Sequence, residues 1–120
     1  ENRYYDNRAS VFQNLGVAYI RLNNIDEAEA AFVRAIQLNP SQNRAMIELA
    51  DIKFTRRNYV EARELYDRYS RNSPATAKTL WLCVRLSRIF SDANEEASCA
   101  QALEGIFPAS DEYREFKETL

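Results

Sequence analysis

The positions of the prolines restrict the fold of this chain more than any other feature. The three prolines are Pro40, Pro74 and Pro108, so both intervals measure 34 residues. Each one follows a stretch rich in helix-forming residues, and a proline there ends the helix because its ring blocks the next turn. A constant period of this length indicates a repeat built from helices.

Bulky and small apolar residues repeat in the same frame. Bulky residues fill the groove between two packed helices, whereas small ones let the helices approach closely. The bulky positions include Phe12, Met46 and Leu80. The small positions include Gly16 with Ala50, and Ala28 with Ala62. Each repeat is therefore expected to be a hairpin of two closely packed helices.

Apolar residues recur at three- and four-residue steps, which is typical of helices. We expect helices near 7–22, 26–38, 42–56, 59–71, 75–90 and 94–105, and a last one over 111–119. The second helix of each repeat opens with an Asn or Asp that is followed three residues later by Glu, which is the pattern of a capping box. These pairs are Asn24 with Glu27, Asn58 with Glu61, and Asp92 with Glu95. Ser110 is the expected cap of the last helix.

The fold class that follows is all-α, a solenoid of three helical hairpins with a capping helix. One domain is expected over residues 1–120, with repeats at about 9–42, 43–76 and 77–110 and the capping helix at 111–119. A stripe of Tyr113, Phe116 and Leu120 would let this last helix cover the open end of the stack, as solenoids require. The composition agrees, because two glycines leave few of the tight turns that an all-β fold needs.

Several classes of function are disfavoured by composition. The absence of histidine removes the commonest general base and metal ligand, and two cysteines are too few for a structural zinc site. A net charge of −2 gives no basic stripe for nucleic acid. The acidic runs at helix starts, such as Asp26 to Glu29, are expected to cap helices and complement their dipoles. We therefore expect a protein-binding role with no enzymatic activity, no cofactor and no metal.

The first unit resembles the tetratricopeptide repeat almost letter for letter. The residues that carry the resemblance are Phe12, Leu15, Gly16, Tyr19, Ala28, Phe32, Ala35 and Pro40, with Phe12 standing where the family usually has Trp. The second unit is similar but has Tyr69 where the family prefers alanine. The third departs further, because Glu96 stands where a small residue is expected. We expect Ala97 and Ala100 to supply the close helix contact there instead.

A narrower resemblance covers nearly the whole chain. It rests on the order of these segments: Asn14-Leu15-Gly16, Glu48-Leu49-Ala50-Asp51, Tyr59-Val60-Glu61-Ala62-Arg63, Tyr66-Asp67, Leu80-Trp81-Leu82-Cys83-Val84-Arg85-Leu86, and Phe107-Pro108-Ala109-Ser110-Asp111-Glu112-Tyr113-Arg114-Glu115-Phe116. Together they are similar to the pilotins of the PilF/PilW family, lipoproteins of type IV pilus biogenesis. The resemblance implies that this chain is the carboxy-terminal half of such a protein, since the family normally has about six repeats.

The same resemblance implies a location and a partner. Pilotins are periplasmic proteins, held at the outer membrane by a lipidated cysteine that is absent from these residues. They assist the secretin PilQ in reaching the outer membrane and forming its multimer. The alternative is a generic peptide-groove adaptor or a co-chaperone scaffold in the cytosol, which only the repeat itself motivates.

In the repeat family, the first helix of each hairpin lines a concave groove, and this locates the candidate partner-binding residues. They are Gln13, Val17 and Ile20 on the first unit, Arg44, Ile47 and Asp51 on the second, and Lys78, Trp81, Leu82, Arg85 and Arg88 on the third. Trp81 has two interpretations, because five apolar residues from Leu80 to Val84 make its helix apolar on more than one side. Either the last helix or another repeat covers Trp81, or it is an aromatic anchor for a partner.

The two cysteines also leave two interpretations open. Cys83 and Cys99 fall on the paired helices of the third hairpin, so a disulfide between them is feasible in an oxidising compartment. The strict geometry of a disulfide slightly favours two small buried thiols instead.

Overall fold

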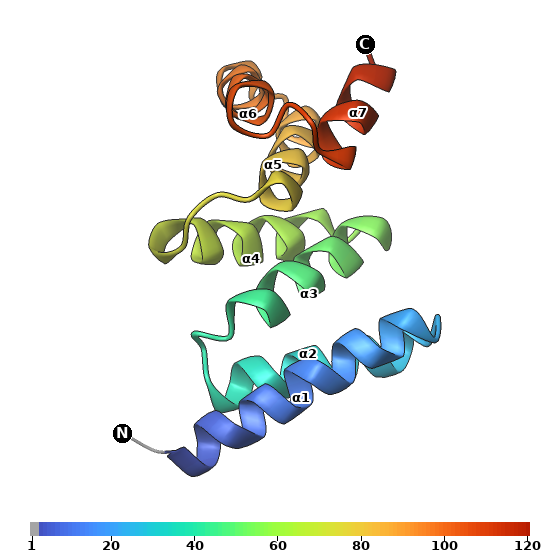
Figure 1. Cartoon of the computed structure of the whole chain (residues 1–120), viewed down its shortest axis with the longest axis vertical. Helices are drawn as coiled ribbons and strands as arrows, with labels where there is room; N and C mark the ends of the chain where they lie inside the picture. Colours follow the sequence, from blue (N-terminus) through green and yellow to red (C-terminus); the bar gives the residue numbers. More distant parts are fainter. Residues whose placement is uncertain (1–2) are drawn as a thin grey trace. The chain divides into compact units, whose positions relative to one another are not determined.

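The computed structural model describes the backbone of residues 3–120 and the side chains from residue 7 onward. These residues form seven α-helices and no strand (Figure 1). The helices are α1 (Arg3–Arg21), α2 (Ile25–Leu38), α3 (Asn43–Thr55), α4 (Tyr59–Asn72), α5 (Ala77–Ile89), α6 (Ala93–Ile106) and α7 (Asp111–Glu118). The predicted all-α class and all seven helices are confirmed, and the largest difference is that α1 begins at Arg3 rather than near residue 7.

The chain divides into two compact units, an amino-terminal unit up to Tyr69 and a carboxy-terminal unit from Ser70. In the amino-terminal unit α1 and α2 pack as an antiparallel hairpin, and α3 packs against α2 before the chain turns back into α4 (Figure 1). In the carboxy-terminal unit α5 and α6 form the hairpin, and α7 packs against both of them. Continuity of all three repeats in one domain over residues 1–120 stays a prediction.

The turn inside each hairpin has the same backbone conformation at three positions 34 residues apart. Asn23, Arg57 and Ser91 all have positive φ, at 61°, 66° and 57°. In each case the N–H of the following residue donates to the carbonyl five residues earlier, as Asn58 does to Lys53 at 2.8 Å. These turns are Schellman motifs, which satisfy the last carbonyls of the first helix. Glycine is the usual residue at the positive-φ position, and none of the three repeats has it there.

The predicted caps are confirmed in part. The Asp92 side chain accepts the Glu95 N–H at 3.1 Å, and the Ser110 hydroxyl accepts the Tyr113 N–H at 3.0 Å. The prediction was wrong for Asn24, whose side chain makes no cap bond. A reciprocal capping box that was not predicted joins Thr76 and Thr79 at the start of α5.

Close packing in the first hairpin is centred on Gly16, as the sequence predicted. A Cβ at Gly16 would collide with the ring of Phe32, which is itself fully buried on α2. The small residues Ala28, Ala50 and Ala62 are also fully buried. The frame of small residues therefore marks the positions where helices approach closely.

The third hairpin is held by different chemistry, and the prediction that Ala97 takes over the close contact was wrong because Ala97 is exposed. Ala100, by contrast, packs on the apolar cluster of this unit. Glu96 instead pairs with Arg88 across the hairpin at 2.8 Å. Cys83 and Cys99 form a disulfide with a Cα–Cα distance of 6.2 Å. The slightly favoured interpretation, two small buried thiols, was therefore wrong. The antiparallel pairing of α5 and α6 supplies the spacing that a disulfide requires.

Candidate protein-binding surface

The candidate groove residues on α1 are half-buried, and Gln13 among them has a structural role. Its Oε1 accepts the backbone N–H of Ala45 at 2.8 Å. Ala45 lies in the first turn of α3, where N–H groups have no partner within their own helix. Gln13 thus joins α1 to the start of α3, whereas Val17 and Ile20 are half-buried apolar side chains. Sequence reasoning missed this bond because Gln13 and Ala45 are far apart in the chain.

On α3, the prediction that Ile47 faces a groove was wrong, because its side chain is only 5 % exposed. Six of the thirteen residues of α3 are buried, and they lie on more than one side of the helix. Arg44 is exposed and pairs with Glu48 at 3.5 Å, and Asp51 is half-buried. Only the polar members of the predicted set therefore reach solvent on this helix.

The same division holds on α5. Leu82 is fully buried, so the prediction that it lines a groove was wrong. Lys78, Arg85 and Arg88 are half-buried and keep part of their surface in solvent. Since Leu80 to Val84 are all buried, the run of apolar residues reflects a helix that is covered on several sides.

Trp81 is covered by α7, which selects the first of the two interpretations above. The indole is 8 % exposed and meets the Phe116 ring edge-on, with centroids 6.2 Å apart. The indole Nε1–H donates to Glu115 Oε1 at 3.3 Å. Tyr113 and Phe116 pack on the apolar cluster around Trp81, as their stripe predicted. Leu120 is 85 % exposed, so its predicted part in the cover was wrong.

Two arginines lie close to the covered indole. The guanidinium of Arg85 lies 5.1 Å from the centroid of the Trp81 ring, and that of Arg88 lies 5.9 Å from it. Arg88 also lies 5.7 Å from the centroid of Phe116. Cations over aromatic faces attract the ring quadrupole. The result is a compact aromatic and cationic group in the carboxy-terminal unit.

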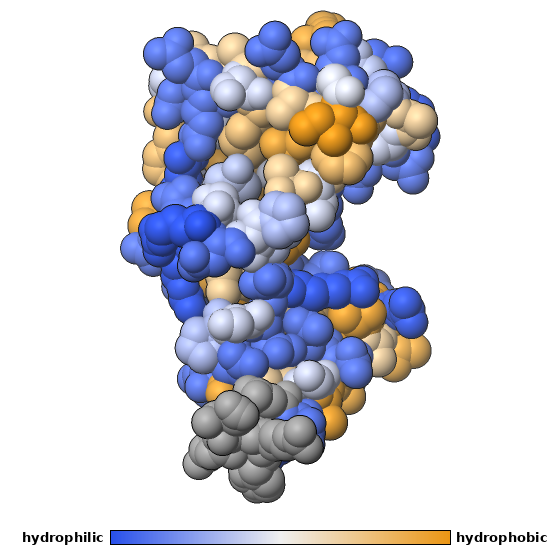
Figure 2. Space-filling view, turned by 60° about the vertical axis from the view of Figure 1, so that its left-hand side comes forward, coloured by the Kyte–Doolittle hydropathy of each residue, from blue (hydrophilic) through white to orange (hydrophobic). Residues whose placement is uncertain are grey.

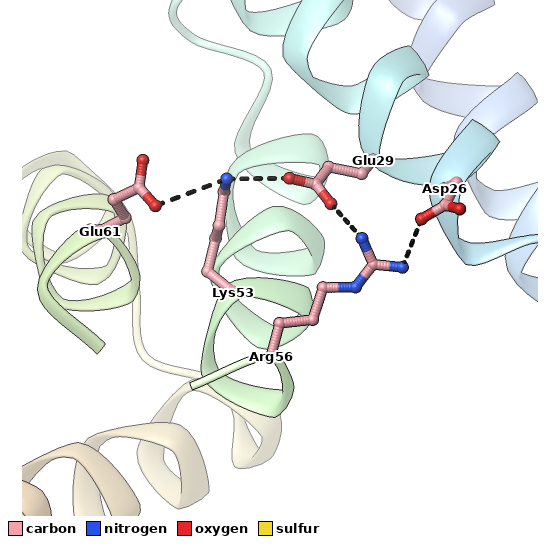
Figure 3. A network of polar contacts seen from close by, with 5 residues as sticks. All are labelled: Asp26, Glu29, Lys53, Arg56 and Glu61. Carbon is pink, nitrogen blue, oxygen red and sulfur yellow. Dashed lines mark hydrogen bonds and ion pairs between the residues drawn. The ribbon is translucent and has the colours of Figure 1, made fainter. Parts of the chain in front are cut away.

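Charged side chains link α2, α3 and α4 in the amino-terminal unit (Figure 3). Glu29 accepts from Lys53 and from Arg56, each at 2.8 Å, and Arg56 also pairs with Asp26 at 2.7 Å. Lys53 reaches Glu61 on α4 at 3.6 Å. The hydrogen bond to Glu29 raises the pKa of Lys53, and the bond to Asp26 raises the pKa of Arg56. Asp26 and Glu29 thus do more than complement a helix dipole, since they join neighbouring helices.

An apolar depression of about 230 Å³ lies between α1 and α2. Phe12, Leu15, Tyr19, Glu27, Ala30 and Ala31 line it. Val11 and Leu15 on this face are 61 % and 39 % exposed, whereas Ala45 and Leu49, their counterparts one period later, are buried. Figure 2 shows apolar residues gathered at the surface of the amino-terminal unit, to which α1 and α2 belong.

The side chains of residues 7–120 include no group of acidic or cysteine residues arranged to hold a metal ion. None of the helices described is both long and apolar enough to cross a bilayer.

Comparison with known proteins finds a family model that matches part of the sequence and a relative that matches nearly all of it. A family model described as tetratricopeptide repeat matches residues 14–77. The type IV pilus assembly protein PilF of Pseudomonas aeruginosa is 32 % identical over 117 residues, which are 98 % of this chain and 46 % of PilF. The chain thus spans about half the length of this curated relative.

Two solved structures resemble the fold. The structure of Pseudomonas aeruginosa PilF matches with a TM-score of 0.91 and 32 % identity, over 100 % of this chain and 54 % of that one. The structure of PilW, described as a widely conserved type IV pilus biogenesis factor, matches with a TM-score of 0.70 over 90 % of this chain and 50 % of that one. At 23 % identity the second likeness shows the fold alone.

Proposed function

Because this chain belongs to the tetratricopeptide-repeat family, we propose that it is a protein-binding assembly factor of type IV pilus biogenesis without enzymatic activity. The observation that carries the proposal is the identity of 32 % to PilF across 98 % of the chain. Shared sequence along all three hairpins favours a shared role more strongly than the repeat fold does, because one fold serves many functions.

The finer proposal concerns the partner and the compartment. We infer that the chain assists the outer-membrane localisation and multimerisation of the secretin PilQ, from the periplasmic side of the outer membrane and as part of a lipid-anchored protein. The disulfide between Cys83 and Cys99 supports an oxidising compartment such as the periplasm. The same disulfide disfavours the cytosolic adaptor, because reducing conditions there keep thiols free.

The proposed contact residues are the polar residues that remain accessible on the first helices, taken for each compact unit by itself. On α5 these are Lys78, Arg85 and Arg88, and on α3 they are Arg44 and Asp51. Ile47 and Leu82 are left out, because their burial removes them from any partner. Arginines are frequent among the residues that contribute most to binding at interfaces.

The test is the state of the secretin in a strain that lacks the gene for this protein. We expect secretin multimers to be lost or mislocalised, and to return when the gene is restored. An Arg85→Glu variant should restore them poorly, whereas the matched variant Arg34→Glu, on the exposed side of α2, should restore them fully. Normal secretin multimers in the deletion strain would refute the proposal.

A further inference from the structure

Ser87 is a fully buried hydroxyl among the apolar residues of α5. Its Oγ lies 3.9 Å from the sulfur of Cys83, one turn earlier on the same helix, and donates to Glu95 Oε1 on α6 at 3.1 Å. Glu95 is half-buried, so its side chain keeps part of its surface in solvent. The three side chains therefore form a polar chain that leads from the buried sulfur of Cys83 to the surface.

The two sulfurs of the disulfide differ in their surroundings. Cys83 is fully buried, as are its neighbours Leu82 and Val84. Cys99 is half-buried, and Ser98 directly before it is exposed. Because reactions at sulfur require access, a reagent outside the protein reaches Cys99 more readily than Cys83.

Contacts other than the disulfide also pair α5 with α6. Arg88 pairs with Glu96 at 2.8 Å, and Leu103 of α6 is fully buried in the apolar cluster that it forms with residues of α5. These contacts do not depend on the bridge, so we expect the reduced chain to hold its two thiols close to the observed Cα–Cα distance of 6.2 Å. At that distance the two sulfurs can join without movement of the backbone.

Burial makes the deprotonation of Cys83 difficult. Only a thiolate attacks a disulfide, and a fully buried thiol cannot pass its proton directly to solvent. A serine hydroxyl can accept one hydrogen bond while it donates another. In the reduced chain Ser87 can therefore accept from the Cys83 S–H while it donates to the Glu95 carboxylate.

We propose that Cys99 is the thiol at which this protein exchanges with an external disulfide, and that Ser87 and Glu95 relay the proton of Cys83. The Cys99 thiolate attacks the external disulfide, forms a mixed disulfide with one of its sulfurs and releases the other as a thiolate. Cys83 then passes its proton through Ser87 to Glu95, and its thiolate attacks the Cys99 sulfur. The bond from Cys99 to the external group breaks, and that group leaves as the second thiolate. The two cysteines are thereby oxidised, and the external disulfide is reduced to two thiols.

Oxidised glutathione added to the reduced, folded chain tests which thiol reacts first. Mass spectrometry of acid-quenched samples distinguishes the mixed disulfide from the internal one. We expect Cys83→Ala to accumulate one glutathione on Cys99, and Cys99→Ala to react at Cys83 at least about tenfold more slowly, because that thiol is buried. Equal rates in the two variants would overturn the assignment of Cys99. Loss of helical circular dichroism on reduction would also overturn it, since the route requires a folded hairpin.

The relay is tested on the second step, which alone is independent of the glutathione concentration. Ser87→Ala and Glu95→Gln should leave the attachment of glutathione to Cys99 unchanged. Both should slow closure of the internal disulfide by at least about tenfold, as expected when a proton acceptor is lost. The matched variant Ser98→Ala, which removes an exposed hydroxyl beside Cys99, should change neither step.

A purely structural role of Ser87 would change the first step as well, because loosened packing alters access to Cys99. Closure at the unchanged rate in both Ser87→Ala and Glu95→Gln would overturn the relay. Should Ser87→Ala lose its helices, Glu95→Gln alone decides. These measurements do not include the secretin, so their failure leaves the proposed function untouched.

Discussion

The ring of Phe32 stands where a β-carbon on Gly16 would have to lie, with its Cδ1 2.7 Å from that point. The two helices of the first hairpin therefore approach so closely that only glycine fits at Gly16. Gly105 on α6 is the contrasting case, because an added Cβ there would meet nothing within 4 Å.

These two glycines predict opposite effects of the same substitution. Gly16→Ala should lower the free energy of unfolding by about 1–3 kcal/mol, because the methyl group overpacks against Phe32. Gly16→Leu should unfold the first hairpin. Gly105→Ala should raise the free energy of unfolding by about 0.5–1 kcal/mol, since alanine restricts the unfolded chain and favours the helix. Thermal and urea unfolding measure both changes. A Gly16→Leu melting curve that matches the unchanged chain would refute the close contact.

The turn after α3 offers a stabilising substitution. Arg57 is exposed, and its φ of 66° is a conformation that is energetically unfavourable for residues other than glycine. Arg57→Gly should therefore stabilise the chain by a few tenths of a kcal/mol or about 1 kcal/mol at most, after the entropy of glycine is subtracted. Arg34→Gly, on an exposed position inside α2, should instead destabilise it by about 1 kcal/mol. If both variants lose stability equally, the Schellman turn is not formed in solution.

The disulfide should stabilise the carboxy-terminal unit. It closes a loop with a sequence separation of 16, for which the chain-entropy model gives about 3 kcal/mol. Reduction with dithiothreitol should therefore lower Tm. A variant with both Cys83→Ala and Cys99→Ala should melt at a lower temperature in either condition and ignore the reductant. An unchanged Tm on full reduction, verified by thiol titration, would contradict this contribution.

Stability should fall on the alkaline side. The bond from Lys53 to Glu29 raises the folded-state pKa of Lys53 above 10.5, so its contribution is complete below that pH and is lost as pH rises through the folded value. Burial raises the pKa of Tyr69 above 10.0, and its ionisation in the unfolded chain acts in the same direction. The urea concentration at the midpoint of unfolding should therefore fall as the pH rises from 9 to above 11. Lys53→Met and Tyr69→Phe should each make this fall smaller. An unchanged pH dependence in both variants would exclude these two groups.

A single domain over residues 1–120 predicts cooperative unfolding. If the two compact units unfold together, circular dichroism and Trp81 fluorescence should give coincident urea transitions. Trp81 lies in the carboxy-terminal unit, whereas circular dichroism reports on both units. Two separated transitions would show that the units are independent.

The sequence was informative where one physical rule decides the outcome. Proline spacing located the helix ends, and the frame of small residues located the contact of Gly16 with Phe32. The positive-φ turns were missed because Asn23, Arg57 and Ser91 share no residue type that would mark them. Side-chain orientation on α3 and α5 was also missed, since a helix with apolar residues on several sides does not reveal which sides are covered.

The third hairpin shows a different limit. Glu96 departs from the pattern of small residues, and the sequence pattern does not reveal that Arg88 pairs with it. The disulfide depends on a few ångströms between Cys83 and Cys99, a distance that residue spacing along two helices does not determine.

The central claim is that this chain acts by binding a protein of type IV pilus assembly. Surface plasmon resonance with the immobilised periplasmic part of the secretin tests it most directly. We expect saturable binding that weakens at least severalfold in Arg85→Glu and is unchanged in Arg34→Glu. Absence of binding by the folded, disulfide-bonded protein, with the secretin verified as native, would contradict the claim.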